Sequence, residues 1–261
     1  MNAKAQANLE ESHVLGDPRE RAVAQRFEAK YFITEVEAAM LRDYMIEYTL
    51  ADRHGAVYPV TSMYLDNVNM TTYNSSLAGE KNRYKLRVRG YEEGVEQPIF
   101  TEVKQRLGRV IRKHRACLHR EVLDHEHWDE PISPSLLVSP DSVREQENLM
   151  LFSELCSRLR AEPKIALRYT REAYVSSLEE PVRVTFDSNI AFIPVPERIR
   201  DIWKEDTQWR IIVDTPIVLE IKFTDSYPLW VRRMIQRFQL TRVSLAKYVV
   251  CYRTLQNEGG F

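Results

Sequence analysis

Positively charged and apolar side chains alternate between Asn82 and the start of the following turn. Every second position is a cation: Arg83, Lys85, Arg87 and Arg89. A β-strand has a side-chain period of two, so these four cations would share one face of a strand. Like charges at this density need either bulk water or a bound polyanion. The spacing therefore points to the binding of a ligand that carries several negative charges.

Other segments with strand-like alternation also place charged residues on one face. They contribute Glu28, Lys30, Glu102, Lys104, Lys113, Arg115, Arg171, Arg183, Glu220 and Lys222. Each face alone is typical of a solvated strand surface. Solvated faces usually mix both signs of charge with Thr, Ser and Gln, whereas these faces are mostly Arg and Lys. Taken together, the faces favour a shared interior over a set of separate exposed surfaces.

A barrel with a polar interior and helices on its outside would bring these faces together. About eight strands leave an interior wide enough for one slim ligand. Arg makes forked contacts with phosphate oxygens and Lys supplies point charges, so a linear phosphate chain would fit. The few carboxylates would hold a divalent metal, because Mg²⁺ takes one or two carboxylates and completes its shell with phosphates and water. We therefore predict an α+β fold, an antiparallel eight-stranded β-barrel that forms a tunnel and is decorated by helices.

The elements that would position these residues follow from alternation, capping signals and turn residues. Thr34 has the features of a helix N-cap, with Glu35 and Glu37 in the first turn. Predicted strands span residues 26–33, 57–66, 82–89, 97–106, 109–118, 163–176, 181–189 and 217–223. Predicted helices span residues 34–48, 69–77, 143–159 and 228–238, and residues 244–252 form a helix or a strand.

The rest of the chain predicts connections around one domain. Residues 1–25 are polar and patternless, which predicts a flexible lead-in to a single domain at 26–255. A turn is expected at residues 92–94 and a tight turn at Gly108. Residues 124–143 contain three prolines and are expected to form a loop.

Composition sets mild limits on function. The net charge is −1 over 261 residues, which does not indicate a general attraction to nucleic acid or to membranes. The three cysteines are far apart and form no Cys-x-x-Cys pair, so we expect a reducing, cytoplasmic location. No apolar stretch approaches the roughly 18 residues of a membrane span, and no signal peptide is visible.

Seven short motifs follow one another in a specific order along the chain. They are Phe-Glu-Ala-Lys-Tyr (27–31), Lys-Leu-Arg-Val-Arg (85–89), Glu-Val-Lys (102–104), Tyr-Thr-Arg (169–171), Arg-Val-Thr-Phe-Asp (183–187), Leu-Glu-Ile-Lys (219–222) and Ser-Leu-Ala-Lys-Tyr (244–248). This ordered set resembles the catalytic domain of the vacuolar transporter chaperone (VTC) proteins, within the CYTH-like triphosphate tunnel metalloenzymes. The resemblance covers residues 26–253. It implies transfer of the terminal phosphate of ATP to a growing polyphosphate chain, with Mn²⁺ or Mg²⁺.

The resemblance and the strand faces together assign candidate site residues. The predicted catalytic residues are Arg87, Arg89, Lys104, Arg171 and Arg183. The predicted substrate-binding residues are Lys30, Lys85, Lys113, Arg115, Lys222 and Lys247. Glu220 is the best candidate for a metal ligand, and Glu28 and Glu102 are the further candidates. Arg112 and Arg115 compete with Lys113 for one family position, and Ser244 lies one residue further from Lys247 than the family pattern implies.

One departure bears on the reaction. Hydrolytic members of the superfamily typically begin with Glu-x-Glu-x-Lys, and here the first of these positions is Arg26. Fewer carboxylates leave fewer groups to hold a second metal or to orient water. The missing carboxylate favours a polymerase that uses ATP and polyphosphate. A membrane-embedded partner protein is compatible with this prediction.

Two alternatives remain, a hydrolase of the same fold and a non-catalytic polyphosphate-binding module. A nucleic-acid-binding sheet is disfavoured, because the aromatic residues mostly alternate away from the cationic faces.

Overall fold

The computed structural model describes residues 26–52, 57–91, 97–108, 110–178, 181–213, 215–224 and 226–258. The predicted lead-in at 1–25 and the predicted turn at 92–94 lie outside these residues. The strands are β1 (Arg26–Ile33), β2 (Thr49–Ala51), β3 (Val57–Asp66), β4 (Asn82–Gly90), β5 (Ile99–Leu107), β6 (Val110–Leu118), β7 (Glu162–Ser176), β8 (Arg183–Pro194), β9 (Arg210–Ile211), β10 (Ile217–Thr224) and β11 (Arg242–Val243).

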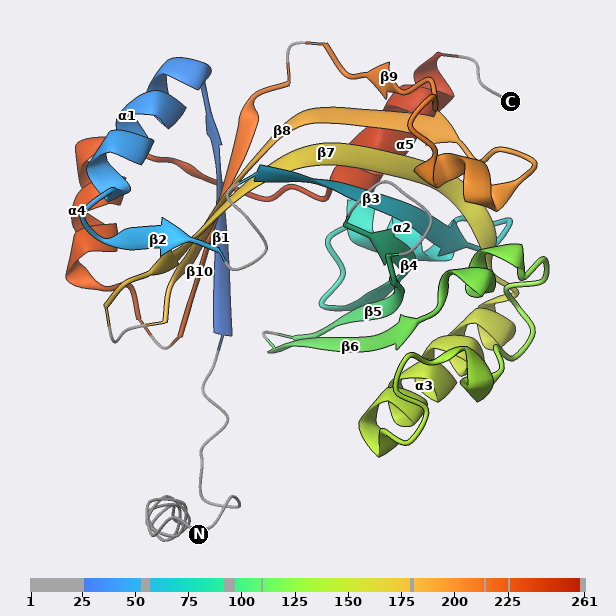
Figure 1. Ribbon diagram of the computed structural model, residues 1–261. Helices are drawn as coiled ribbons and strands as arrows, with labels where there is room; N and C mark the ends of the chain where they lie inside the picture. The colour runs from blue at the N-terminus through green and yellow to red at the C-terminus, as the bar shows by residue number, and fades with distance from the viewer. Residues whose placement is uncertain are drawn as a thin grey trace, which may run out of the picture.

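In the part of the chain that the structure describes, five α-helices accompany the strands (Figure 1). They are α1 (Glu35–Met45), α2 (Thr71–Leu77), α3 (Val143–Leu159), α4 (Leu229–Arg237) and α5 (Lys247–Asn257). Three 3-10 helices lie in the connections: η1 (Arg120–Asp124), η2 (Pro134–Leu136) and η3 (Ile199–Trp203). The undecided segment at 244–252 is therefore mainly helical.

All eleven strands belong to one antiparallel sheet, which confirms the α+β class. Its order is β11-β1-β10-β8-β7-β3-β4-β5-β6, with β2 added to β7 and β9 added to β8. The prediction of a closed barrel of eight strands was wrong in the number of strands and in the closure. β2, β9 and β11 are only two or three residues long, too short to show an alternating pattern. The strands that end the order, β6 and β11, are not paired with each other among the described residues, so the sheet stays open.

Local signals in the sequence explain where several elements begin. The Thr34 hydroxyl accepts a hydrogen bond from the Glu37 amide at 3.2 Å, and the Glu37 carboxylate accepts one from the Thr34 amide at 2.7 Å. This reciprocal capping box begins α1 at the predicted residue. Ser142 caps α3 through a single hydrogen bond, which its hydroxyl accepts from the Glu145 amide. Gly108 has a positive φ of 60° in the turn between β5 and β6, a conformation that glycine adopts without strain.

Helices cover the outer face of the sheet at both ends of its curve (Figure 1). α1 and α4 pack on β1, β8 and β10 through an apolar cluster that includes Leu41, Leu219 and Trp230. α3 packs on β4, β5 and β6 through a cluster that includes Val103 and Phe152. Because the outer face is sealed by these two clusters, the charged side chains of the same strands lie on the inner face.

Candidate functional site

Two rungs of charged side chains cross β4, β5 and β6 on the inner face. In one rung, Lys85, Lys104 and Lys113 stand opposite one another. In the next, Arg87, Glu102 and Arg115 do so. Like charges directly opposite on a sheet are destabilising. The first rung therefore stores electrostatic repulsion that a bound anion would relieve.

Among the described residues of β4, β5 and β6, which form the first wall, Glu102 is the one carboxylate on the inner face, and four cations surround it. Its side chain is completely buried. One oxygen lies 2.6 Å from Lys113 Nζ and 3.3 Å from Arg115 Nε. The other lies 2.5 Å from Arg87 Nη2 and 3.9 Å from Arg89 Nη1. Burial alone would raise the pKa of Glu102, but the adjacent cations hold it well below its usual range.

A second wall is formed by β1, β10 and β8, and it carries more carboxylate. Glu220 lies 2.9 Å from Lys222, 3.5 Å from Lys30 and 3.8 Å from Arg171. Lys30 also contacts Glu28 at 2.5 Å. Burial alone would raise the pKa of Glu220, whereas its three cationic neighbours hold it well below the usual range. Burial would likewise lower the pKa of Lys30, but Glu220 and Glu28 raise it above the ordinary value.

A third cluster joins β7, β8 and the start of α5. Asp187 accepts two hydrogen bonds of 2.7 Å from Arg171 and lies 2.6 Å from Lys247 Nζ. Lys247 also lies 4.7 Å from the centre of the Tyr169 ring. Burial would raise the pKa of Asp187, but Lys247 and Arg171 lower it to about 2. Asp187 thus stays ionised and fixes two predicted phosphate-binding cations.

Sequence reasoning did not select the groups that hold the other arginines. Arg183 donates to Asp52 at 2.7 Å and to the Tyr58 hydroxyl at 3.0 Å. Arg89 donates to the Ser62 hydroxyl at 2.9 Å. These partners belong to other strands or lie far away in sequence. The alternation in β3 does place Tyr58 and Ser62 on one face, and this was the available signal.

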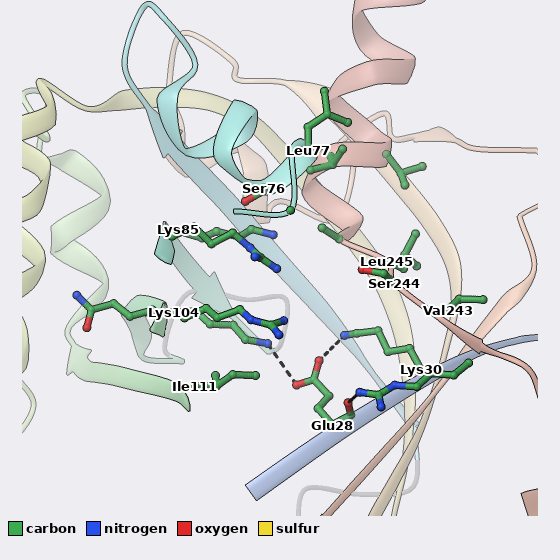
Figure 2. A pocket seen from close by; sticks show the side chains of 18 residues that line it. Glu28, Lys30, Ser76, Leu77, Lys85, Lys104, Ile111, Val243, Ser244 and Leu245 are labelled. Carbon is green, nitrogen blue, oxygen red and sulfur yellow. Dashed lines mark hydrogen bonds and ion pairs between the residues drawn. The ribbon is translucent and has the colours of Figure 1, made fainter. Parts of the chain in front are cut away.

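Strand β1 of the second wall faces β4 and β5 of the first wall across a cavity of about 720 Å³ (Figure 2). Its lining includes Glu28 and Lys30 from β1, Lys85 from β4 and Lys104 from β5. Ser244, between β11 and α5, also lines it. Glu28 lies 3.2 Å from Lys104 Nζ, so one ion pair crosses from β1 to β5. Side chains therefore connect walls whose backbones are not hydrogen-bonded to each other.

The structure brings all fourteen predicted site residues onto this inner surface in two groups. The β4–β6 wall holds Lys85, Arg87, Arg89, Glu102, Lys104, Lys113 and Arg115. The opposite group holds Glu28, Lys30, Arg171, Arg183, Glu220, Lys222 and Lys247. Lys113 shares the rung of Lys104, whereas its competitor Arg112 alternates to the other face of β6.

A family model described as the VTC domain matches residues 25–256. The chain belongs to the VTC domain family. No curated protein matches this VTC domain significantly. Among solved structures, a Hippeastrum protein described as an adenylyl cyclase with a dominant triphosphatase activity has 11% identity and a TM-score of 0.50, covering 88% of this chain and 96% of that chain. That likeness shows a shared fold. The PH1819 protein of Pyrococcus horikoshii gives 10% identity and a TM-score of 0.43, over 86% and 96% of the two chains.

The fold family implies a divalent metal, and the carboxylates of the VTC domain differ in how well they fit one. The described residues contain no group of three or more His, Cys, Asp or Glu that could hold a metal ion. Cations lie within 2.7 Å of both oxygens of Glu102 and of Asp187, whereas the cations nearest to the two oxygens of Glu220 lie at 2.9 and 3.5 Å. Glu102 therefore fits its predicted role as a metal ligand less well than Glu220 does. Glu28 and Glu220 lie on the paired strands β1 and β10. Burial and the charge of Glu220 would raise the pKa of Glu28, but Lys104 and Lys30 lower it below its usual range. Two such carboxylates fit Mg²⁺ that completes its shell with phosphates.

The VTC domain offers no helix for membrane crossing in its described part, where every helix is too short or too polar.

Proposed function

We propose that this VTC domain is a metal-dependent polyphosphate polymerase that transfers the terminal phosphate of ATP to a growing polyphosphate chain. The observation that carries the proposal is the pair of facing walls. One wall is cationic and surrounds Glu102, whose two oxygens are both paired with cations. The other wall contains Glu28 and Glu220, the two carboxylates that we assign to the metal. Membership of the VTC family supports the same substrate class.

A phosphate chain would lie between the walls and replace ion pairs that the protein makes with itself. Its oxygens would compete with Glu28 for Lys104, which the structure holds at 3.2 Å. Arg87 and Arg89 would offer forked contacts from one side, and Arg183 from the other. The lysine rung of β4–β6 would lose its mutual repulsion on binding. Binding energy therefore comes from cations that the fold already holds in place.

In the proposed reaction, an oxygen at the end of the polyphosphate chain attacks the γ-phosphorus of ATP. A new P–O–P bond forms, the bond from the γ-phosphorus to the β–γ bridging oxygen breaks, and ADP leaves with that oxygen. No protein nucleophile is needed, so catalysis is positioning and charge neutralisation. The negative charge that develops on the transferred phosphoryl group would be stabilised by Arg87, Arg89 and Lys104. A divalent metal held by Glu28 and Glu220 would supply further neutralisation when bound.

Two other functions use the same groups. A triphosphatase would hold the phosphates identically and admit water, and the Hippeastrum neighbour is described as having that activity. A non-catalytic binding module would hold polyphosphate through the cations and would need no metal ligand. The small number of available carboxylates favours the polymerase, because hydrolysis needs a group that orients water.

The products formed from ATP and Mn²⁺ separate these functions. We expect wild-type protein to yield long phosphate chains and ADP, seen on a gel and by a phosphate assay. The Lys104→Ala variant removes a cation of the first wall that contacts Glu28 of the second wall. This variant should no longer form long phosphate chains. Free phosphate alone would replace the polymerase by the triphosphatase, and binding without turnover under any divalent metal would indicate a sensor.

A further inference from the structure

The guanidinium of Arg87 is held by two strands at once. From β5, the Glu102 carboxylate accepts hydrogen bonds or ion pairs from Arg87 Nε at 2.7 Å and Nη2 at 2.5 Å. From β3, the Tyr64 hydroxyl accepts a hydrogen bond from Arg87 Nη1 at 3.0 Å. Among the described residues, Tyr64 is the hydrogen-bond partner of this third nitrogen. The carboxylate fixes one edge of the guanidinium and the phenol fixes its outer end.

Tyr64 is itself held rigidly. Its ring stacks on Tyr248 of α5, with 4.6 Å between ring centres and 1° between ring planes. The Tyr248 hydroxyl donates to Asp66 at 3.0 Å. Asp66 is fully buried and also accepts hydrogen bonds from the amides of Thr72 and Tyr73 in α2. The Tyr64 ring is thus stacked on a ring that is itself bound to a buried carboxylate, and this holds the Tyr64 hydroxyl in one place.

Tyr248 directly follows Lys247, the residue that α5 contributes to the inner face. One helix turn therefore presents a cation to Asp187 and supports the ring beneath Arg87. Movement of α5 would displace both cations together. Glu102 holds the Nε–Nη2 edge of Arg87 through one oxygen, whereas the position of Nη1 depends on Tyr64.

We propose that Tyr64 is a positioning residue for Arg87 and that its stack on Tyr248 couples Arg87 to the helix that carries Lys247. The kinetic part of this inference rests on the proposed function. The hydroxyl lies in strongly positive surroundings, because burial alone would raise the pKa of Tyr64 whereas Arg87, Arg89 and Lys85 lower it to about 8. An oxygen in that field accepts a hydrogen bond from a guanidinium favourably.

Tyr64→Phe tests the hydroxyl and leaves the stacked ring in place. We expect kcat for ATP-dependent chain synthesis to fall about tenfold with KM changed less than about threefold, since a mispositioned Arg87 costs most in the transition state. Tyr84→Phe is the matched control, because Tyr84 lies on the same strand as Arg87 but on the outer face. It should behave as wild type. Tyr248→Phe keeps the stack but loses the bond to Asp66, and it should give a smaller decrease.

A double-mutant cycle on tripolyphosphate binding, measured by calorimetry, tests the coupling without turnover. Tyr64→Phe should weaken binding by about twofold to threefold in wild type and have almost no effect in Arg87→Lys. Additive effects, or equal behaviour of Tyr64→Phe and Tyr84→Phe at unchanged thermal stability, would overturn the inference. If wild type makes no polyphosphate, the proposed function fails while the binding cycle still decides the role of Tyr64.

Discussion

The pairing of individual charges determines which cations a ligand can use. Arg171 is fixed bidentately by Asp187, whereas Lys113 has a side chain 41% exposed to solvent and shares its carboxylate with three other cations. Lys113 can therefore turn toward an anion without leaving Glu102 uncompensated. The adjacent Arg112 faces away from the cavity.

This difference predicts the outcome of two neighbouring substitutions. Lys113→Ala should weaken tripolyphosphate binding by about tenfold, because it removes a charge from the lysine rung. Arg112→Ala removes the same charge from the other face of β6 and should change binding by less than about twofold. Calorimetric titration at constant salt measures both. Equal losses would mean that general charge, and not the inner face, attracts the anion.

The protonation of the lysine rung predicts a pH dependence. Burial, aided by Lys104 and Arg87, lowers the pKa of Lys85 to about 8, and burial lowers that of Lys113 to about 8 despite its ion pair with Glu102. A lysine with a lowered pKa loses its charge as pH rises through that value. A bound polyanion favours the charged form and raises the pKa again. Tripolyphosphate binding should therefore weaken from about pH 7 to about pH 9.5 and take up protons near pH 8.

Proton uptake is measured by calorimetry in buffers of different ionisation enthalpy. The Lys113→Met variant serves as control and should take up fewer protons than wild type. Binding that is independent of pH and releases no buffer heat would contradict the values assigned to the two lysines.

At the scale of the elements, α1 stabilises the outer face without touching the site. Thr34→Ala removes the hydroxyl that caps α1 and should lower the free energy of unfolding by about 1 kcal/mol. Chain synthesis should stay at the wild-type rate, because α1 packs on the far side of β1. Urea unfolding together with an activity assay checks both parts. Thr34→Ser keeps the hydroxyl and should restore stability, and a Thr34→Ala protein of unchanged stability would contradict the cap.

Long elements could be predicted from the sequence because their pattern repeats. The bounds of β1, β3 and α3 agree with prediction, and α1 begins where its cap indicates. Two- and three-residue strands such as β2 and β9 could not be recognised, since they lack a full period. Asp187 was missed for another reason. Its role depends on Arg171 across the register of β7 and β8 and on Lys247 sixty positions away, and neither relation is visible along the chain.

At the scale of the whole molecule, the sheet curves without closing, and interior side chains connect its two walls. The Glu28–Lys104 pair crosses from β1 to β5, while β6 and β11 remain unpaired with each other among the described strands. The alternating pattern along the sequence placed these charges on one face of each strand, and the structure places that face inward. The pattern could not predict that the Glu28–Lys104 pair, the one such pair among the described residues, would connect the walls, because this depends on the curvature of the complete sheet. Residues 26–255 remain our predicted domain.

A crystal structure of the protein with tripolyphosphate tests this account most directly. We predict that the phosphate chain lies in the cavity between the walls, with oxygens on Lys104 and Arg87 and the Glu28–Lys104 contact of 3.2 Å broken. A chain bound on the outer surface, or an intact Glu28–Lys104 pair beside a ligand elsewhere, would contradict the proposal that the two walls form a phosphate-transfer site.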